Sequence, residues 1–246
     1  LMNPTIDLLN AHRSIRKFTD DPVPDEQVRE IVAAGQAAAT SSNVQAVSVI
    51  QVNQPAMRES MAKLAGGQPW VTAAGAFLVW CADLRRSGAA CARAGGELEV
   101  GMTEHFLIAT VDVALAAQNA VIAAESMGLG ICYIGGLRNN PAKVSELLAL
   151  PEQVYPVFGL CLGYPAQDPD IKPRLSLDAV LMQDTYSSEQ QDAHFDDYNQ
   201  RLGHYYQTRT GGTKVSQWTD EMKKLVGKES RPHMRDFLNS QGFKMR

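Results

Sequence analysis

Stretches rich in apolar and β-branched residues predict four β-strands along the chain. They cover residues 46–52, 76–82, 131–134 and 156–163. The second stretch contains Phe77-Leu78-Val79-Trp80-Cys81 and is apolar at consecutive positions rather than at alternating ones. A strand of this kind has both faces buried, so we expect it in the centre of the sheet.

Apolar residues spaced by three and four positions predict helices around these strands. Asn3 and Pro4 form a helix start, because asparagine caps a helix and proline suits its first turn. A second helix is expected to begin near Pro24. Further helices are predicted over residues 57–64, 104–127, 141–148, 195–205, 218–226 and 232–240. Strands alternating with helices, followed by a helical tail, predict an α+β or three-layer fold.

The helix over 104–127 is apolar nearly all round and rich in alanine, and Gly128 and Gly130 end it. Such a helix is buried, either under a sheet or at a subunit interface. We do not predict that it crosses a membrane, because polar side chains interrupt its apolar stretch and are costly in lipid. These polar residues are Asp112, Gln118, Asn119 and Glu125.

Composition indicates an ordinary globular protein, with 45% hydrophobic and 20% charged residues among 246. The formal net charge of -4 argues against a nucleic-acid-binding surface. No signal peptide is recognisable, so we expect a cytoplasmic protein. Four cysteines form no C-x-x-C pair and five histidines show no metal-ligand spacing, so no metal site is predicted. Cys81, Cys132 and Cys161 lie in apolar runs and are expected to be buried and reduced.

The candidate chemistry begins with the basic segment His12-Arg13-Ser14-Ile15-Arg16, at the end of the first helix. Its guanidinium groups suit a phosphate, although cations at a helix end are also typical of a solvated surface. Lys172-Pro173-Arg174 offers a second basic cluster with the same two interpretations. Tyr133-Ile134-Gly135-Gly136 follows a strand, where glycine lets a ligand approach the backbone closely. Thr40-Ser41-Ser42-Asn43 is a hydroxyl and amide cluster of the kind that turns also use.

Together these blocks resemble the bacterial group A, oxygen-insensitive, NADPH-dependent nitroreductases and the related flavin reductases of luminous bacteria. The resemblance runs over essentially the whole chain. Besides the blocks above, it includes 66–68, 118–120, 122–126, 137–140, 158–163 and 228–232.

The resemblance implies a nitroreductase-like three-layer α/β/α sandwich with a mixed, mainly antiparallel sheet, in an intertwined homodimer. Residues 1–246 would form a single domain, with an FMN-binding core over 1–165. Residues 166–246 would form a C-terminal extension that wraps the partner subunit and supplies a loop for NADPH.

The resemblance also implies the roles of individual residues. Gly135 would be the catalytic position, with its N–H near the flavin N5. The other residues expected to bind FMN are His12, Arg13, Ser14, Arg16, Ser41, Gln68, Tyr133, Ile134, Gly136, Lys172 and Arg174. The residues expected to meet NADPH or substrate are Ser42, Asn43, Arg138, Arg209 and Arg231, with Arg209 in a mobile loop over 208–214.

The implied activity is two-electron, ping-pong transfer from NADPH through FMN to small-molecule acceptors such as nitroaromatics or quinones. Asn43 departs from the family pattern, which has an aromatic residue there, and leaves the acceptor preference open. Two alternatives remain: an NADPH:FMN reductase that supplies reduced flavin, and a flavin-binding or sensing protein without turnover. Neither nucleic acid nor membrane is an expected partner.

Overall fold

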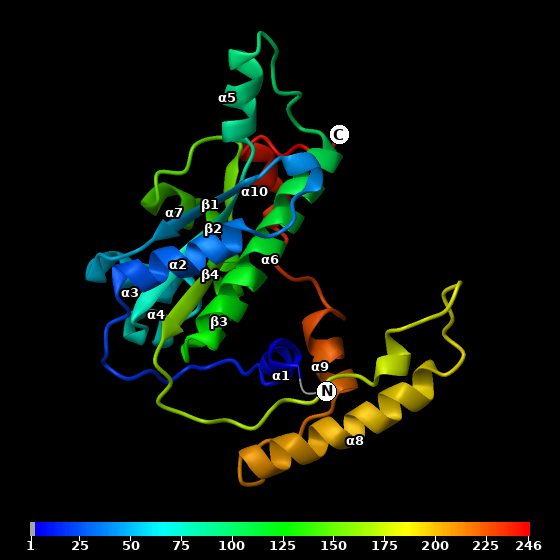
Figure 1. The fold of residues 1–246 in the computed structure, drawn as a ribbon. Helices are drawn as coiled ribbons and strands as arrows, with labels where there is room; N and C mark the ends of the chain where they lie inside the picture. The colour runs from blue at the N-terminus through cyan, green and yellow to red at the C-terminus, as the bar shows by residue number, and fades with distance from the viewer. Residues whose placement is uncertain (1–2) are drawn as a thin grey trace. The chain divides into compact units, whose positions relative to one another are not determined.

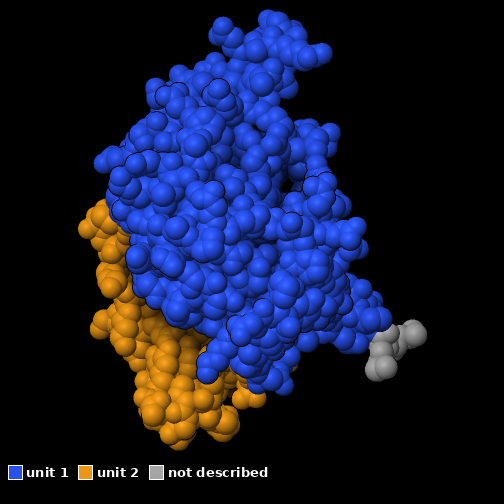
Figure 2. All heavy atoms as spheres, turned by 90° about the vertical axis from the view of Figure 1, so that its left-hand side faces the viewer, with its two compact units in different colours: residues 1–168, 233–246 blue, residues 169–232 orange. Residues whose placement is uncertain are grey.

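The computed structural model describes residues 3–246, and its chain forms two compact units (Figure 2). Unit 1 contains the residues up to Asp168 together with His233–Arg246, and unit 2 is Pro169–Pro232. The segment 166–246, which we expected as one extension, is therefore divided. Its last part belongs to unit 1 because Phe237, Leu238 and Phe243 are buried in the core of that unit.

A four-stranded sheet forms the centre of unit 1, in the order β1-β2-β4-β3 (Figure 1). Its strands are β1 (Val47–Gln51), β2 (Ala76–Asp83), β3 (Gly130–Ile134) and β4 (Val154–Gly163). Each neighbouring pair is antiparallel, and the parallel component is a single bridge between Ser14 and Ile131. β2 and β4 lie in the centre, as the apolar sequence of β2 predicted.

Helices cover both faces of this sheet and produce the expected three layers. On one face, α2 (Asp25–Gln36) and α6 (Thr103–Ser126) run side by side and bury Leu78, Trp80 and Leu160 (Figure 1). The opposite face carries α3 (Pro55–Leu64), α4 (Trp70–Ala73) and α7 (Pro141–Leu147). Beneath those helices lie Phe77, Cys132 and Cys161, among other residues. All four cysteines are free, and Cys81, Cys132 and Cys161 are buried as predicted.

α6 is long and apolar enough to cross a membrane, but it packs against α2 and the sheet. Asp112 lies on its buried side with an exposed fraction of 2%. The side of α6 that faces solvent carries Leu107, Val111 and Leu115, whose exposed fractions are 49%, 52% and 43%. One side of the helix therefore belongs to the core, and an apolar stripe remains on the other.

Several short elements were absent from the sequence prediction. α5 (Arg85–Arg93) buries no residue, so no apolar stripe marks it in the sequence. Short 3₁₀ helices occupy Ser41–Asn43 (η1), Gly135–Asn139 (η2) and Leu177–Ala179 (η3). The remaining helices of unit 1 are α1 (Pro4–Asn10) and α10 (Met234–Ser240).

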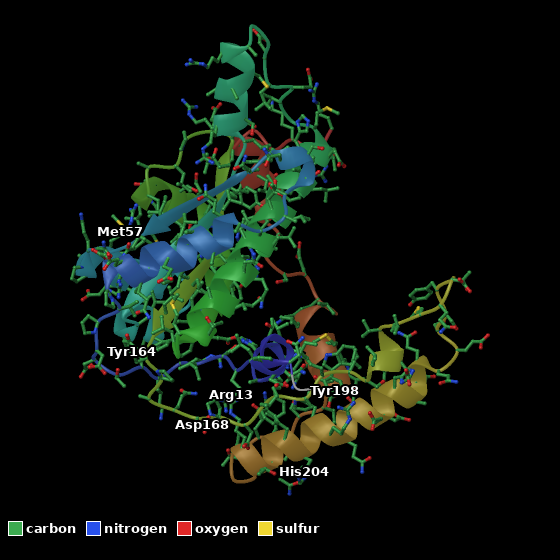
Figure 3. All side chains as sticks on the ribbon, viewed as in Figure 1. Arg13, Met57, Tyr164, Asp168, Tyr198 and His204 are labelled. Carbon is green, nitrogen blue, oxygen red and sulfur yellow. The ribbon has the colours of Figure 1, made fainter. Side chains whose placement is uncertain are left out.

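Unit 2 is built on α8 (Gln191–Arg209) and α9 (Trp218–Leu225). Its small core contains Tyr198, Leu202, Tyr205 and Tyr206, and Trp218 packs against it. Tyr198 turns toward α9 and His204 points away from it (Figure 3). The expectation that Arg209 lies in a mobile loop is wrong, because the helix continues through Arg209 and the chain turns only at Gly211 and Gly212.

Candidate functional site

The basic segment 12–16 runs beside the strand that leads to the glycine pair. Ser14 forms a parallel bridge with Ile131, and the Ile15 N–H donates to the Ile131 carbonyl at 2.8 Å. Gly130 makes this approach possible, because a Cβ there would lie 2.6 Å from the Ile15 side chain. The packing of Ile15 against Gly130 therefore places the polar residues on either side of it, Ser14 and Arg16, alongside β3.

Arg16 extends toward the region between β3 and α4. Its guanidinium carbon lies 5.7 Å from the centre of the Trp70 ring, a cation–π distance. Burial raises the pKa of the Cys132 thiol, and the charge of Arg16 opposes that rise. Arg16 itself is exposed. The structure thus places the guanidinium of Arg16 near Cys132 of β3 and Trp70 of α4.

His12 and Arg13 each have an acidic partner. His12 Nδ1 lies 2.6 Å from Glu125 Oε1, near the end of α6. Arg13 Nη1 donates to Asp168 Oδ1 at 2.5 Å, and the two side chains meet in Figure 3. A cavity of about 590 Å³ adjoins both pairs, and Arg13, Ile15 and Glu125 are among its lining residues.

Gly135 and Gly136 begin η2, where the loop before α4 comes very close. A Cβ on Gly136 would lie 2.3 Å from the Ala65 carbonyl oxygen and 2.6 Å from Gln68 Nε2. Gln68 is held there by donating to the Ala65 carbonyl at 2.7 Å. At Gly135 a Cβ would meet only the end of the Arg138 side chain, at 3.3 Å. Gln68 and the glycine pair, far apart in sequence, are therefore neighbours.

The Tyr133 side chain is half-buried. Its ring meets Phe158 edge-on with 4.9 Å between the centres, and its hydroxyl donates to Gln118 at 3.4 Å. Burial raises the pKa of the Tyr133 phenol, and the nearby carboxylate of Glu125 adds to this shift. The phenol therefore stays neutral. Ile134 is fully buried, so its side chain does not face outward.

Arg138 is expected to contact nucleotide or substrate, and in the structure its guanidinium lies against the sheet. Nη1 donates to the Val157 carbonyl on β4 at 2.5 Å. His233 Nε2 donates to the Arg138 carbonyl at 2.9 Å, which joins η2 to the segment before α10. These contacts give Arg138 a structural role in unit 1.

The loop that contains Ser41, Ser42 and Asn43 contacts α6 at a different position along the helix axis from His12. The loop that contains them is bound to Asp112, whereas His12 is bound to Glu125. Thirteen residues of helix separate these two carboxylates, which corresponds to about 20 Å along the axis. The side chains of Ser41, Ser42 and Asn43 are exposed. Asn43 lines a larger cavity of about 1270 Å³ along β1, which none of the residues 12–16 lines.

The remaining predicted cations belong to unit 2. Lys172 Nζ donates to the Tyr206 hydroxyl at 2.9 Å, and Arg174 Nη1 donates to the Lys172 carbonyl at 2.8 Å. Arg209 is exposed on the last turn of α8, where Nη1 donates to the Tyr205 hydroxyl at 3.0 Å. Arg231 adopts a positive φ of 50°, next to the end of the unit.

Sequence reasoning missed the two carboxylates that hold these segments. Asp112 and Glu125 were noted only as polar interruptions in an apolar helix. That interruption was itself a signal, because a charged residue in a buried helix face needs hydrogen-bond partners. Nothing in the sequence indicates which segments supply them. Among residues 3–246, no cluster of three or more His, Cys, Asp or Glu side chains is arranged to hold a metal ion.

Comparison with known proteins covers both units. The profile of the nitroreductase family matches residues 9–164, and that of the nitroreductase family C-terminal domain matches residues 172–246. The chain is 44% identical over 245 residues to the oxygen-insensitive NADPH nitroreductase of Salmonella typhimurium, covering 100% of both. It is 45% identical over 248 residues to the NADPH-flavin oxidoreductase of Vibrio harveyi, again covering 100% of both.

Solved structures show the same fold. The NADPH:FMN oxidoreductase from Vibrio harveyi complexed with NAD+ matches with a TM-score of 0.91 at 43% identity. That match covers 99% of this chain and 100% of the other. Sequence and fold agree over the full length, and this chain belongs to the nitroreductase family.

Proposed function

We propose that this protein is an FMN-dependent NADPH oxidoreductase that reduces nitroaromatics, quinones or related small acceptors. The observation that carries the proposal is the course of segment 12–16 beside β3, which leads directly into Gly135 and Gly136. The full-length similarity to enzymes named for NADPH and flavin supports it.

The residues of unit 1 suit FMN in both charge and shape. Between Ile131, beside Ser14, and Gly135 lie four residue steps of extended chain, or about 13 Å. That span suits a ribityl chain joining a phosphate to a flat ring. At the phosphate end we assign His12, Arg13, Ser14 and Arg16. Lys172 and Arg174 were also expected to bind FMN, and that expectation stays a prediction. At the ring end we assign Gln68 and the backbone of Tyr133–Gly136.

FMN, when bound, would supply the redox chemistry by taking a hydride from NADPH and passing two electrons to an acceptor. The chain binds and orients these molecules, and no side-chain nucleophile is needed. Arg209 and Arg231 are proposed to contact NADPH, with Arg209 at its 2′-phosphate. Ser42 and Asn43 would contact the acceptor, and the Gly135 N–H would face the reacting edge of the ring.

We further propose a homodimer whose sites use both copies. The apolar stripe Leu107, Val111 and Leu115 follows one side of α6 at helical spacing, as an interface helix would. Ser41–Asn43 and His12 lie at different levels of that helix, and a second copy can complete each site. Unit 2, with its largely irregular segment before α8, would embrace the partner. We place the protein in the cytoplasm, acting on small molecules rather than nucleic acid or membranes.

One set of experiments tests the activity. The purified protein should be yellow, contain FMN and have the mass of a dimer by light scattering. NADPH added without oxygen should bleach the flavin, and a quinone added after removal of nucleotide should restore the colour. Initial rates at several acceptor concentrations should give parallel double-reciprocal lines, because NADPH and acceptor use the same cleft in turn. Intersecting lines, with no product from the isolated reduced enzyme, would instead indicate a ternary complex.

The names of the relatives favour one second candidate, in which free FMN is itself the acceptor. Comparing kcat/KM for free FMN with that for nitrofurazone and a quinone separates the two enzymes. A flavin that is bound tightly but is not bleached by NADPH would contradict both and identify a binding protein without turnover.

A further inference from the structure

We propose that Asp112 is a positioning residue that holds the segment Ser41–Asn43 in the conformation it presents to bound flavin and acceptor. This inference rests on the proposed function for what the segment touches. The conformation of the segment and its attachment to α6 are features of unit 1 alone.

The segment is held in a conformation that its own sequence does not favour. Ser42, Asn43 and Gln45 have φ values of 47°, 59° and 56°. The left-handed region is unfavourable for residues with a Cβ atom, although asparagine tolerates it better than most. Three such residues among four, none of them glycine, require support from outside the loop.

Asp112 gives that support from both sides of the strained residues. Its Oδ2 accepts from the Thr40 hydroxyl at 2.6 Å and from the Ala46 N–H at 3.0 Å. Its Oδ1 accepts from the Ser41 N–H at 3.3 Å. The Thr40 oxygen in turn accepts from the Gln45 N–H at 2.9 Å. One carboxylate thus closes the loop over residues 40–46.

The anchor is rigid and the segment it holds is exposed. Asp112 is 2% exposed, and its neighbours Ala109, Val113 and Ala116 are buried in the core of unit 1. Ser41, Ser42 and Asn43 direct exposed polar side chains outward. Asp112 therefore transfers the fixed position of α6 to groups that would meet a ligand, without itself touching one.

The direct test is Asp112→Asn, which keeps the side-chain size but places an NH2 group where a donor already points. At least one of the three loop hydrogen bonds is then lost. We expect the amides of Ser41 and Ala46 to exchange hydrogen faster, and KM for a quinone acceptor to rise about tenfold while kcat changes less than about twofold. The matched control is Thr110→Val, which removes a hydroxyl on the same helix that bonds Phe106 and Tyr155 instead of the loop.

A second substitution separates positioning from general stability. Gln45 has a positive φ but is not assigned to the ligand site, and glycine adopts this conformation without steric cost. Adding Gln45→Gly to Asp112→Asn should therefore recover part of the acceptor KM. A purely structural role would lower the unfolding midpoint, leave KM unchanged and give no such recovery. If Asp112→Asn does not fold, Thr40→Val removes the two hydrogen bonds of the Thr40 hydroxyl, to Asp112 and from the Gln45 N–H, but leaves the Asp112 bonds to Ser41 and Ala46. It should therefore change amide exchange and the acceptor KM in the same direction.

Two results would overturn the proposal: exchange of the Ser41 and Ala46 amides as in the wild type, or a destabilised Asp112→Asn protein with the wild-type acceptor KM. Failure of the proposed function looks different. If the wild-type protein binds no flavin and oxidises no NADPH, the activity is wrong. Amide exchange in the Asp112 and Thr40 variants then still reports whether the carboxylate holds the loop.

Discussion

His12 Nδ1 and Glu125 Oε1 lie 2.6 Å apart, although 113 positions separate the two residues in the chain. Glu125 belongs to the last turns of α6, and His12 begins the segment that runs beside β3. Because Nδ1 faces the carboxylate, Nε2 occupies the opposite edge of the imidazole. When the imidazole carries both protons, that second nitrogen can donate to an anion.

Removal of the Glu125 carboxylate should weaken FMN binding. In Glu125→Ala the His12 ring loses the contact that orients it, at a cost of about 0.5–1.5 kcal/mol in binding free energy. Fluorescence titration of the apoprotein with FMN measures the change. Glu104→Gln, an exposed glutamate at the start of the same helix, should bind like the wild type. Unchanged affinity in Glu125→Ala would mean that His12 does not contact the phosphate.

Arg16→Ala should weaken FMN binding by about 1.5–3 kcal/mol, the usual range for a charge-assisted hydrogen bond. The same loss is expected for Arg174→Ala if unit 2 contributes to the phosphate site. Lys17→Ala provides the control, because Lys17 is the exposed cation next to Arg16. An FMN dissociation constant that moves equally in the Arg16 and Lys17 variants would indicate only a general effect of charge.

Arg209→Ala should raise KM for NADPH by about tenfold and leave KM for NADH nearly unchanged, because NADH lacks the 2′-phosphate. Arg209 lies over the Tyr205 ring at 5.8 Å and donates to its hydroxyl. Tyr205→Phe should therefore produce a smaller shift in the same direction. Lys224→Ala, an exposed cation on α9, serves as the control. Equal changes for both nucleotides would remove Arg209 from the phosphate site.

The two neighbouring glycines should respond differently to alanine. Gly136→Ala places a methyl group 2.3 Å from the Ala65 carbonyl, and relief of that overlap should cost about 1–3 kcal/mol of unfolding free energy. In Gly135→Ala the nearest atom to the new methyl group is Arg138 Nη2 at 3.3 Å, a much looser contact, so this variant should fold normally and change FMN binding and turnover instead. Urea unfolding and flavin titration of both variants give the comparison. Gly203→Ala, with open space around it, should not destabilise the protein. Similar urea midpoints for Gly135→Ala and Gly136→Ala would contradict this distinction.

Much of the fold could be predicted because its signals are local. All four predicted strands match the observed ones to within two residues, since apolar runs mark buried strands directly. α5 was missed because it buries nothing, and the helical position of Arg209 was missed because threonines and glycines follow it closely. Tyr205 was correctly predicted as the last marker of α8, but a composition rich in turn residues concealed the final turn up to Arg209.

The candidate site was predictable in its parts but not in its assembly. The basic and glycine-rich segments were recognisable by residue type, but only the structure shows that Ser14 pairs with β3 and that the glycine pair follows the end of that strand. The left-handed conformations of Ser42 and Gln45 have no sequence signal, and the carboxylate that bonds the loop on both sides of them is distant in the chain. The contact of Arg138 with Val157 was not predictable for a related reason: an arginine beside a glycine pair looks available, and only packing shows that it reaches the Val157 carbonyl.

Both boundaries of unit 2 are attached to unit 1. Asp168, the last residue before it, binds Arg13, and His233, the first residue after it, binds the Arg138 carbonyl. Beyond His233, the chain contributes Phe237, Leu238 and Phe243 to the core under α6. A protease that cuts only within 169–232 would therefore leave a nicked protein. Its two fragments would separate on a denaturing gel but elute together from a gel-filtration column. They stay associated because Phe237, Leu238 and Phe243 of the short C-terminal fragment are buried in the core of unit 1.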